Sequence, residues 1–213
     1  MIRNAITQSI KRDVETLQHV LENIRIGDVR RDVDLFCYVI NTHTHTKSKQ
    51  IETLTTSLLQ AKNVFTTGIG KSGYVARRTA ASMTSVGVSA QFVHAAEWVH
   101  GDLGCLDSGS LVLSFSHSGN TKELCDLASL LQTRDVSSAA IVGSSKGKLC
   151  ELCDDVIVVP CGEELLGLVP SRSIVAQEAV TNAILSELVE RRDFQTEDFG
   201  RNHPGGNIGK ILS

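Results

Sequence analysis

A glycine-rich segment, residues 63–73 with the sequence NVFTTGIGKSG, constrains the fold of this chain more than any other feature. Val64 and Phe65, near its start, are typical of a buried strand. The segment that follows is typical of a helix and reads YVARRTAASMTSVG. A strand that enters a helix through glycines presents the first backbone N–H groups of that helix to an anion. The segment therefore predicts an α/β fold with an anion site at the end of a strand.

The rest of the chain repeats this alternation of strand and helix. Short apolar runs predict five strands, at 63–67, 89–94, 110–116, 138–143 and 155–160. The intervening and following segments predict helices, at 72–86, 121–133, 146–153 and 172–192. Such alternation predicts a doubly wound, five-stranded parallel sheet that is covered by helices on both faces. Ligands of such sheets bind beyond the carboxyl ends of the strands.

Apolar residues also recur at helical spacing before the first strand, and they predict helices over 2–25, 29–40 and 49–61. We expect a single domain over residues 1–213, in which 1–61 form a helical extension and 62–213 form the α/β core. A free apolar face of this extension is expected to pack against another copy of the chain.

Composition limits the classes of partner and cofactor. The formal net charge is −3 and the isoelectric point is about 6.2, which argues against a basic face for nucleic acid. The apolar runs are too short to span a bilayer, and the N-terminus lacks the apolar core of a secretory signal, so we expect a cytoplasmic protein without a membrane partner. Six cysteines in apolar contexts predict reduced thiols. Neither the lone Cys150/Cys153 pair nor His43 and His45 has further ligands at metal-site spacing, so no metal is expected.

The glycine turn at 68–73 admits several interpretations. It satisfies G-x-G-x-x-G, the dinucleotide fingerprint, but the second strand ends at His94 without the acidic residue that holds a ribose. A Walker A loop needs a glycine at the position of Phe65, so that interpretation fails. In a sugar-phosphate site, Gly70 and Ser72 would supply hydrogen-bond donors and Lys71 a positive charge. The remaining interpretation is a tight turn with a surface lysine.

A second turn of this kind follows the third strand, at 116–121 with the sequence SHSGNT. The hydroxyls of Ser116, Ser118 and Thr121, together with the first N–H groups of the next helix, are suited to surround a phosphate dianion. Serine and threonine also cap helices without any ligand, so an ordinary capping turn is the alternative.

Four segments together resemble the sugar isomerase (SIS) domain, and in particular the D-arabinose-5-phosphate isomerases: GIGKSG, FVHAAEWVHGDLG, SFSHSGNTKEL and DFGRNHPGGNIGKIL. The resemblance runs from about residue 60 to the end. These isomerases often continue into paired CBS domains, so the chain is similar to the isolated catalytic domain. The resemblance implies cofactor-independent interconversion of D-ribulose 5-phosphate and D-arabinose 5-phosphate through an enediol. An isomerase of a different phosphosugar, or a non-catalytic sugar-phosphate sensor, is the alternative.

The resemblance also implies roles for individual residues. The residues that match the family's functional positions are Lys71, His100, Glu123 and His203, and Lys71 is further expected to hold phosphate with the 116–121 turn. The loop after the last strand leaves both Glu163 and Glu164 as equivalents of the family's glutamate, and we take Glu163 as the catalytic one. His117 and Arg172 are expected to line the substrate site with Gly70, Ser72 and the hydroxyls of the second turn. The histidine loops of this family reach across subunits, which predicts a homotetramer or dimer with shared active sites.

Overall fold

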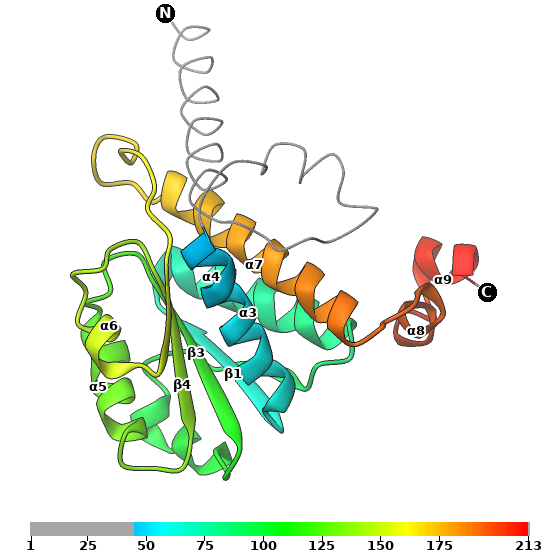
Figure 1. The fold of residues 1–213 in the computed structure, drawn as a ribbon, viewed down its shortest axis with the longest axis horizontal. Coiled ribbons are helices and arrows are strands. Elements are labelled where there is room, and N and C mark those ends of the chain that lie inside the picture. Colours follow the sequence, from blue (N-terminus) through cyan, green and yellow to red (C-terminus); the bar gives the residue numbers. More distant parts are fainter. Residues whose placement is uncertain (1–44, 213) are drawn as a thin grey trace, which may run out of the picture.

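The computed structural model describes residues 45–212 of the chain, with side chains from residue 49 onward (Figure 1). The helices predicted over 2–25 and 29–40 lie outside this part of the chain. The third predicted N-terminal helix is present as α3 (His45–Gln60), which precedes the first strand.

All five predicted strands are confirmed, and they form one parallel sheet. They are β1 (Asn63–Gly68), β2 (Ala90–Phe92), β3 (Ser110–Ser116), β4 (Ser137–Val142) and β5 (Asp155–Val158). Their order in the sheet is β2-β1-β3-β4-β5. The chain therefore reverses its direction of progress across the sheet after β2, and the reversal point lies between β1 and β3. The second strand is shorter than its apolar run predicted, because it lies at the edge of the sheet and pairs with β1 alone.

Helices cover both faces of the sheet, which confirms the doubly wound α/β class. The helices after β1 and β5 are α4 (Gly70–Ser85) and α7 (Arg172–Arg191), and those after β3 and β4 are α5 (Lys122–Leu131) and the short α6 (Leu149–Leu152). Figure 1 shows α3, α4 and α7 on one face of the sheet and α5 and α6 on the other.

Alternating residues of the strands pack into separate apolar clusters on the two faces of the sheet. Leu111, Leu113 and Phe115 of β3 belong to a cluster with residues of α3, α4 and α7. Val112, between them, belongs to a cluster with Leu127 and Leu131 of α5. All seven residues of β3 are buried, as expected for the central strand of a sheet that is covered on both faces.

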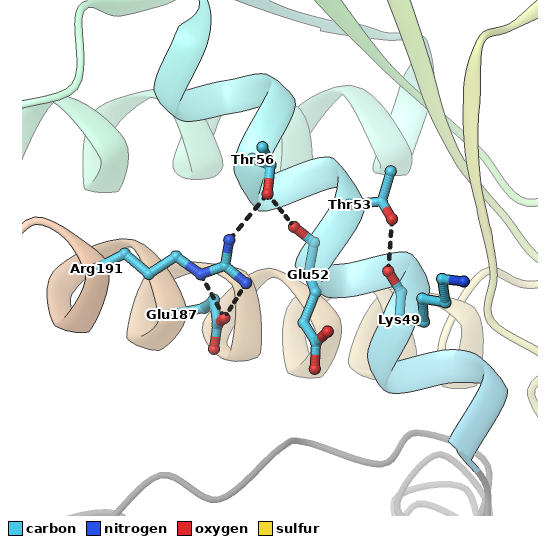
Figure 2. Close-up of polar contacts among 6 residues, drawn as sticks. All are labelled: Lys49, Glu52, Thr53, Thr56, Glu187 and Arg191. Atoms are coloured by element: carbon cyan, nitrogen blue, oxygen red, sulfur yellow. Dashed lines mark hydrogen bonds and ion pairs between the residues drawn. The ribbon is translucent and has the colours of Figure 1, made fainter.

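Helix α3 is held against the last turn of α7 by a polar contact as well as by apolar packing (Figure 2). The Arg191 guanidinium donates from Nη1 to Thr56 Oγ1 at 2.9 Å and bridges to the Glu187 carboxylate one turn earlier on its own helix, at 2.6 Å. Thr56 Oγ1 in turn donates to the carbonyl oxygen of Glu52 at 2.8 Å. The described part of the N-terminal helical extension is therefore an integral layer of the domain.

Two further helices follow α7, where the sequence analysis assigned none. They are α8 (Thr196–Asn202) and α9 (Gly206–Leu212), and Figure 1 shows them beyond the carboxyl end of α7. Each has seven residues, which is too short for a periodic apolar pattern to emerge. The local signal for α8 is a capping box between Gln195 and Asp198. No helix within residues 45–212 has the length and apolarity needed to cross a membrane.

Candidate functional site

The two predicted anion-binding turns follow neighbouring strands at the reversal point of the sheet. Gly68, the last residue of β1, is paired with Phe115 of β3, and Ser116 follows immediately. The turn from β1 into α4 and the turn from β3 into α5 therefore begin side by side. Crevices at such a reversal point are the usual ligand sites of open parallel sheets, because both helix N-termini direct N–H groups toward them.

In the first turn, glycines allow β1 and α4 to approach closely. A Cβ built on Gly73 would lie 2.9 Å from the carbonyl oxygen of Gly68, so a side chain there would force the strand and helix apart. Gly70 begins α4 with a φ of +60°, in the left-handed region that favours glycine. Lys71 is exposed and Ser72 is half-buried in the first turn of the helix. The first turn of α4 thus carries both backbone N–H groups and a lysine, whose Nζ lies 6.0 Å from the centroid of the Tyr74 ring.

In the second turn, the hydroxyls bond to one another and to the turn backbone. Ser116 Oγ lies 2.9 Å from Thr121 Oγ1 and accepts from the Gly119 N–H at 3.1 Å. Ser118 Oγ accepts from the Asn120 N–H at 3.1 Å. Thr121 is the N-cap residue of α5, yet its side chain caps no N–H of that helix. The interpretation as an ordinary capping turn therefore fails at Thr121, and the first N–H groups of α5 are left for another acceptor.

The loop that carries His100 is fastened to β1 by a buried tryptophan. Trp98 begins a 3-10 turn (Trp98–His100), which is followed by another (Asp102–Cys105). Its ring is fully buried against Phe65, with the centroids 5.8 Å apart, and its Nε1–H donates to Thr67 Oγ1 at 3.0 Å. Because Thr67 is the penultimate residue of β1, this bond secures the loop near the carboxyl end of that strand. His100, two residues later, is exposed.

The loop after β5 distinguishes the two neighbouring glutamates. The carboxylate of Glu164 accepts the backbone N–H groups of Ser171, Arg172 and Ser173 at 2.7, 2.9 and 3.2 Å, and the Ser171 hydroxyl at 2.8 Å. Burial alone would raise the pKa of Glu164, but hydrogen bonds from Ser173 and Ser171 outweigh it and lower the pKa to about 2. Glu164 therefore serves as the N-terminal cap of α7. Glu163 is exposed beside it, and Glu123 is exposed in the first turn of α5.

Arg172 occupies a different environment from the one its sequence position suggests. Its side chain is 1% exposed, and its Nη1 donates to Ser171 Oγ at 3.2 Å. The structure thus places this predicted substrate contact inside the loop rather than on its surface. Arginine is rarely this buried unless it is paired, and here its neighbours are Ser171 and the loop that also holds Glu164.

His203 lies far from the two turns within one chain. It ends α8, where its ring stacks on Phe199 with the centroids 3.9 Å apart and its Nδ1 lies 3.0 Å from the Phe199 carbonyl oxygen. The neighbouring Asn202 side chain donates to the carbonyl oxygen of Ser85, the last residue of α4. Lys71 is at the opposite end of α4, whose 16 residues extend about 24 Å. The structure brings the two predicted anion-binding turns together but leaves His203 near the opposite end of α4.

Two shallow cavities beside the glycine turn contain residues that the sequence analysis did not select. A cavity of about 290 Å³ lies between α4 and the start of α7, lined by Lys71, Tyr74, Pro170, Ser171 and Glu178 among others. Another, of about 260 Å³, is lined by Gly70, Tyr74, Arg77, Phe92 and His94 among others. Tyr74 borders both and is 70% exposed. Its position three residues after Lys71, on the same face of a helix, is the signal that was available in the sequence.

The cysteines among residues 45–212 are all free thiols, as the sequence predicted. In the Cys150/Cys153 pair, burial raises the pKa of both thiols, that of Cys153 to about 12, so neither is a ready thiolate. Cys161, after β5, lies near His117 and Glu164.

Comparison with known proteins places this chain in a family. The SIS domain model matches residues 57–187 of the chain. Arabinose 5-phosphate isomerase KdsD of Pseudomonas aeruginosa is 34% identical over 151 residues, which make up 70% of this chain and 46% of that protein. Arabinose 5-phosphate isomerase GutQ of Salmonella typhi is 35% identical over 151 residues, 70% of this chain and 47% of that protein. The chain thus spans about half the length of these curated relatives.

Solved structures agree with this assignment. The fold matches that of c3406 from E. coli CFT073 in complex with A5P, with a TM-score of 0.76 and 28% identity, covering 96% of this chain and 100% of that one. The Vibrio vulnificus NanR protein, complexed with ManNAc-6P, shares the fold at a TM-score of 0.73 and 18% identity, covering 97% of this chain and 67% of that one.

Proposed function

We propose, from the premise that this chain belongs to the SIS domain family, that it is an aldose-ketose isomerase that interconverts D-ribulose 5-phosphate and D-arabinose 5-phosphate. The observation that carries the proposal is the adjacency of the two phosphate-type turns at the reversal point of the sheet. Two helix N-termini and two sets of hydroxyls beside one crevice are suited to a phosphate dianion at the end of a small substrate. The relatives named arabinose 5-phosphate isomerase support the choice of sugar.

The phosphate would be held by the two turns acting together. Lys71 supplies a point charge, Ser72 a hydroxyl, and α4 and α5 supply N–H groups at their first turns. Thr121 and Ser116 already bond to each other, so the hydroxyl pair is oriented before substrate arrives. Because these donors are already oriented, little conformational entropy is lost when phosphate binds.

The chemistry at the other end of the sugar is a proton transfer between C1 and C2. A base removes the proton from C2 of the aldose, or from C1 of the ketose, and the resulting enediol is reprotonated at the neighbouring carbon. A second group moves a proton between the two oxygens. His100, His203, Glu123 and Glu163 are the candidates, since each is a titratable side chain that the family resemblance assigns to the site. No cofactor is needed, because the reaction moves hydrogens within one molecule.

Assembly of copies would complete the site. Asn202, next to His203, bonds to the carbonyl oxygen of Ser85, and Ser85 lies about 21 Å from Lys71 along α4. A histidine near that end of α4 takes part in the reaction only if it enters the crevice of another copy. Tyr74, which lines both cavities beside the glycine turn, is 70% exposed, and Leu166 and Leu168 in the loop before α7 are 90% and 84% exposed. Their burial against a second copy would favour a dimer or tetramer with shared sites.

A coupled or chromatographic isomerase assay on D-ribulose 5-phosphate tests the proposal. The wild-type chain should form D-arabinose 5-phosphate, and Lys71→Ala should raise KM strongly because it removes charge from the phosphate site. Lys62→Ala is the matched control, since Lys62 is an exposed lysine directly before β1, at the end of the strand opposite the glycine turn. Tight binding of a pentose phosphate without turnover would replace the isomerase with a sugar-phosphate sensor. Turnover of another phosphosugar alone would correct the substrate.

A further inference from the structure

Three side chains with metal-ligating atoms converge at the carboxyl edge of the sheet. His117 follows β3, and Cys161 and Glu164 follow β5; one ligand atom from each lies within 4.8 Å of the others. Neighbouring ligands of a tetrahedral zinc ion are about 3.5 Å apart, given Zn–S and Zn–N distances of about 2.3 and 2.0 Å. His117 is exposed and Cys161 half-buried, so small side-chain rotations would close this difference.

The end of β4 is shaped so that the His117 ring can reach toward β5. Gly143 directly follows β4, which lies between β3 and β5 in the sheet. A Cβ built on Gly143 would be 2.3 Å from His117 Nδ1 and 2.6 Å from its Cε1. The imidazole therefore occupies the space that any other residue at 143 would fill. The Gly143 N–H also donates to the His117 carbonyl oxygen at 2.8 Å, which fixes the backbone of this histidine.

The other two ligands are held in place by the loop. Four hydrogen bonds from the start of α7 fix the Glu164 carboxylate, three of them to Oε2 and the fourth, from the Ser173 N–H, to Oε1. Because Oε1 accepts one of these bonds and Oε2 three, Oε1 is the oxygen that we assign to an ion. Burial raises the pKa of the Cys161 thiol to about 11, and the Glu164 carboxylate adds to the rise. A metal that takes this thiolate releases the proton to solvent.

We propose that His117, Cys161 and Glu164 bind one Zn²⁺ ion and leave its fourth coordination position open. One sulfur, one nitrogen and one oxygen ligand suit zinc, because harder cations select oxygen alone. The thiolate and the carboxylate balance the two positive charges of the ion. The positive charge of the Arg172 guanidinium acts on Cys161 and would also repel a metal cation. The negative charges of the thiolate and the carboxylate offset this repulsion. Zinc sites with three protein ligands and an open position can exchange the fourth ligand. Structural zinc sites instead have four protein ligands and are closed.

Metal binding to the full-length, tag-free chain tests the proposal without reference to isomerase activity. Equilibrium dialysis should find a zinc ion that is absent from a Cys161→Ser variant. Co²⁺ in the same site should produce the near-ultraviolet charge-transfer band of a thiolate–cobalt bond. A wild-type chain without that band would overturn the proposal, as would a band that survives Cys161→Ser.

Further variants separate this site from others on the chain. His117→Gln should weaken zinc binding at least about tenfold, since even the loss of an outer-shell contact costs about 10–100-fold; unchanged affinity would refute the site. His117 is exposed, so this variant should remain folded. Cys105→Ser, Cys150→Ser and the double variant His43→Ala/His45→Ala should each keep the cobalt–thiolate band. Loss of the band in Cys150→Ser instead would move the site to the Cys150/Cys153 pair and end the proposal.

The glycine at 143 offers a test that removes no ligand. Gly143→Ala should displace the His117 ring and weaken zinc binding, while the Cys161 and Glu164 side chains remain. Gly104→Ala is its matched control, because a Cβ at Gly104 meets nothing within 4 Å. Equal zinc affinity in Gly143→Ala and Gly104→Ala, with both variants folded by circular dichroism, would contradict the proposed geometry.

Discussion

The backbone of Gly147 lies directly against that of Gly119: a Cβ built on Gly147 would be 2.6 Å from the Gly119 Cα and 2.7 Å from the Ser118 carbonyl oxygen. Two hydrogen bonds reinforce this contact, from the Leu149 N–H to the Gly119 carbonyl oxygen at 3.0 Å and from the Lys148 N–H to Asn120 Oδ1 at 2.9 Å. The loop between β4 and α6 thereby holds the 116–121 turn, the second part of the proposed phosphate site, in shape.

Gly147→Ala should therefore damage phosphate binding from outside the site. The added methyl group meets backbone on the opposite side, which cannot rotate away, and overpacking of this kind costs about 1–3 kcal/mol. We expect a lower melting temperature and at least about tenfold weaker binding of a sugar phosphate by calorimetry, roughly 1.4 kcal/mol. Gly104→Ala, which adds the same methyl group in open space, should bind as the wild type does. Equal binding by the two variants would show that the 119–147 contact does not shape the turn.

Mixing two inactive variants should restore activity if copies share a site. Lys71→Ala and His203→Ala each lose one component of the proposed site. In a mixed dimer, one crevice combines the intact Lys71 of one copy with the intact His203 of the other. Random exchange between equal amounts would recover roughly one quarter of the sites in a symmetric dimer. Activity that stays at the sum of the separate variants after subunit exchange would place both residues in the site of one chain, or His203 outside it.

Acid unfolding should report the cap that Glu164 places on α7. Its pKa is lowered from 4.5 to about 2 in the folded protein, so the ionised carboxylate stabilises the fold above pH 4.5. That stabilisation should disappear as the pH falls from about 4.5 toward 2. Glu164→Gln should lower the free energy of unfolding at pH 7 by about 1 kcal/mol, the usual effect of an N-cap. Denaturant titrations from pH 7 to pH 2 measure both effects.

Glu163→Gln is the matched control for that experiment, because Glu163 is the exposed neighbour of Glu164. It should leave the pH dependence of stability between 4.5 and 2 unchanged. The contrary outcome is that Glu163→Gln reduces the pH dependence of the unfolding free energy below pH 4.5 as much as Glu164→Gln does. In that case the hydrogen bonds to Glu164 would not be the cause of that pH dependence.

The bond between Trp98 and Thr67 should affect both stability and turnover. Trp98→Phe leaves the buried Thr67 hydroxyl without its donor, at a cost of about 1–3 kcal/mol. Because the bond secures the loop that carries His100, we expect kcat to fall more than KM rises. The double variant Trp98→Phe/Thr67→Val removes both polar partners and should recover part of the lost stability. Thermal melts and steady-state kinetics on the single and double variants test this coupling.

Much of the fold follows from local patterns in the sequence. The five strands were predicted because each is a short apolar run bounded by turn residues, and a parallel sheet buries such runs on both faces. The two turns at the reversal point were also predicted, since glycine and hydroxyl residues lie between a strand and a helix in both. Helices α8 and α9 were missed because seven residues carry too little periodicity. The choice between Glu163 and Glu164 could not be made either, because both precede α7 at nearly the same distance.

The sequence by itself determined the α/β class, the order of its elements and the two turns, because backbone preference and apolar periodicity act over a few neighbouring residues. Only the tertiary structure decided which distant residues meet. The strand order brings His117 over Gly143 toward Cys161, and α4 separates Lys71 at its start from Ser85 at its end, where Asn202 next to His203 is bound. Such relations depend on how strands pair and helices pack across the sheet, which no local pattern of side chains records.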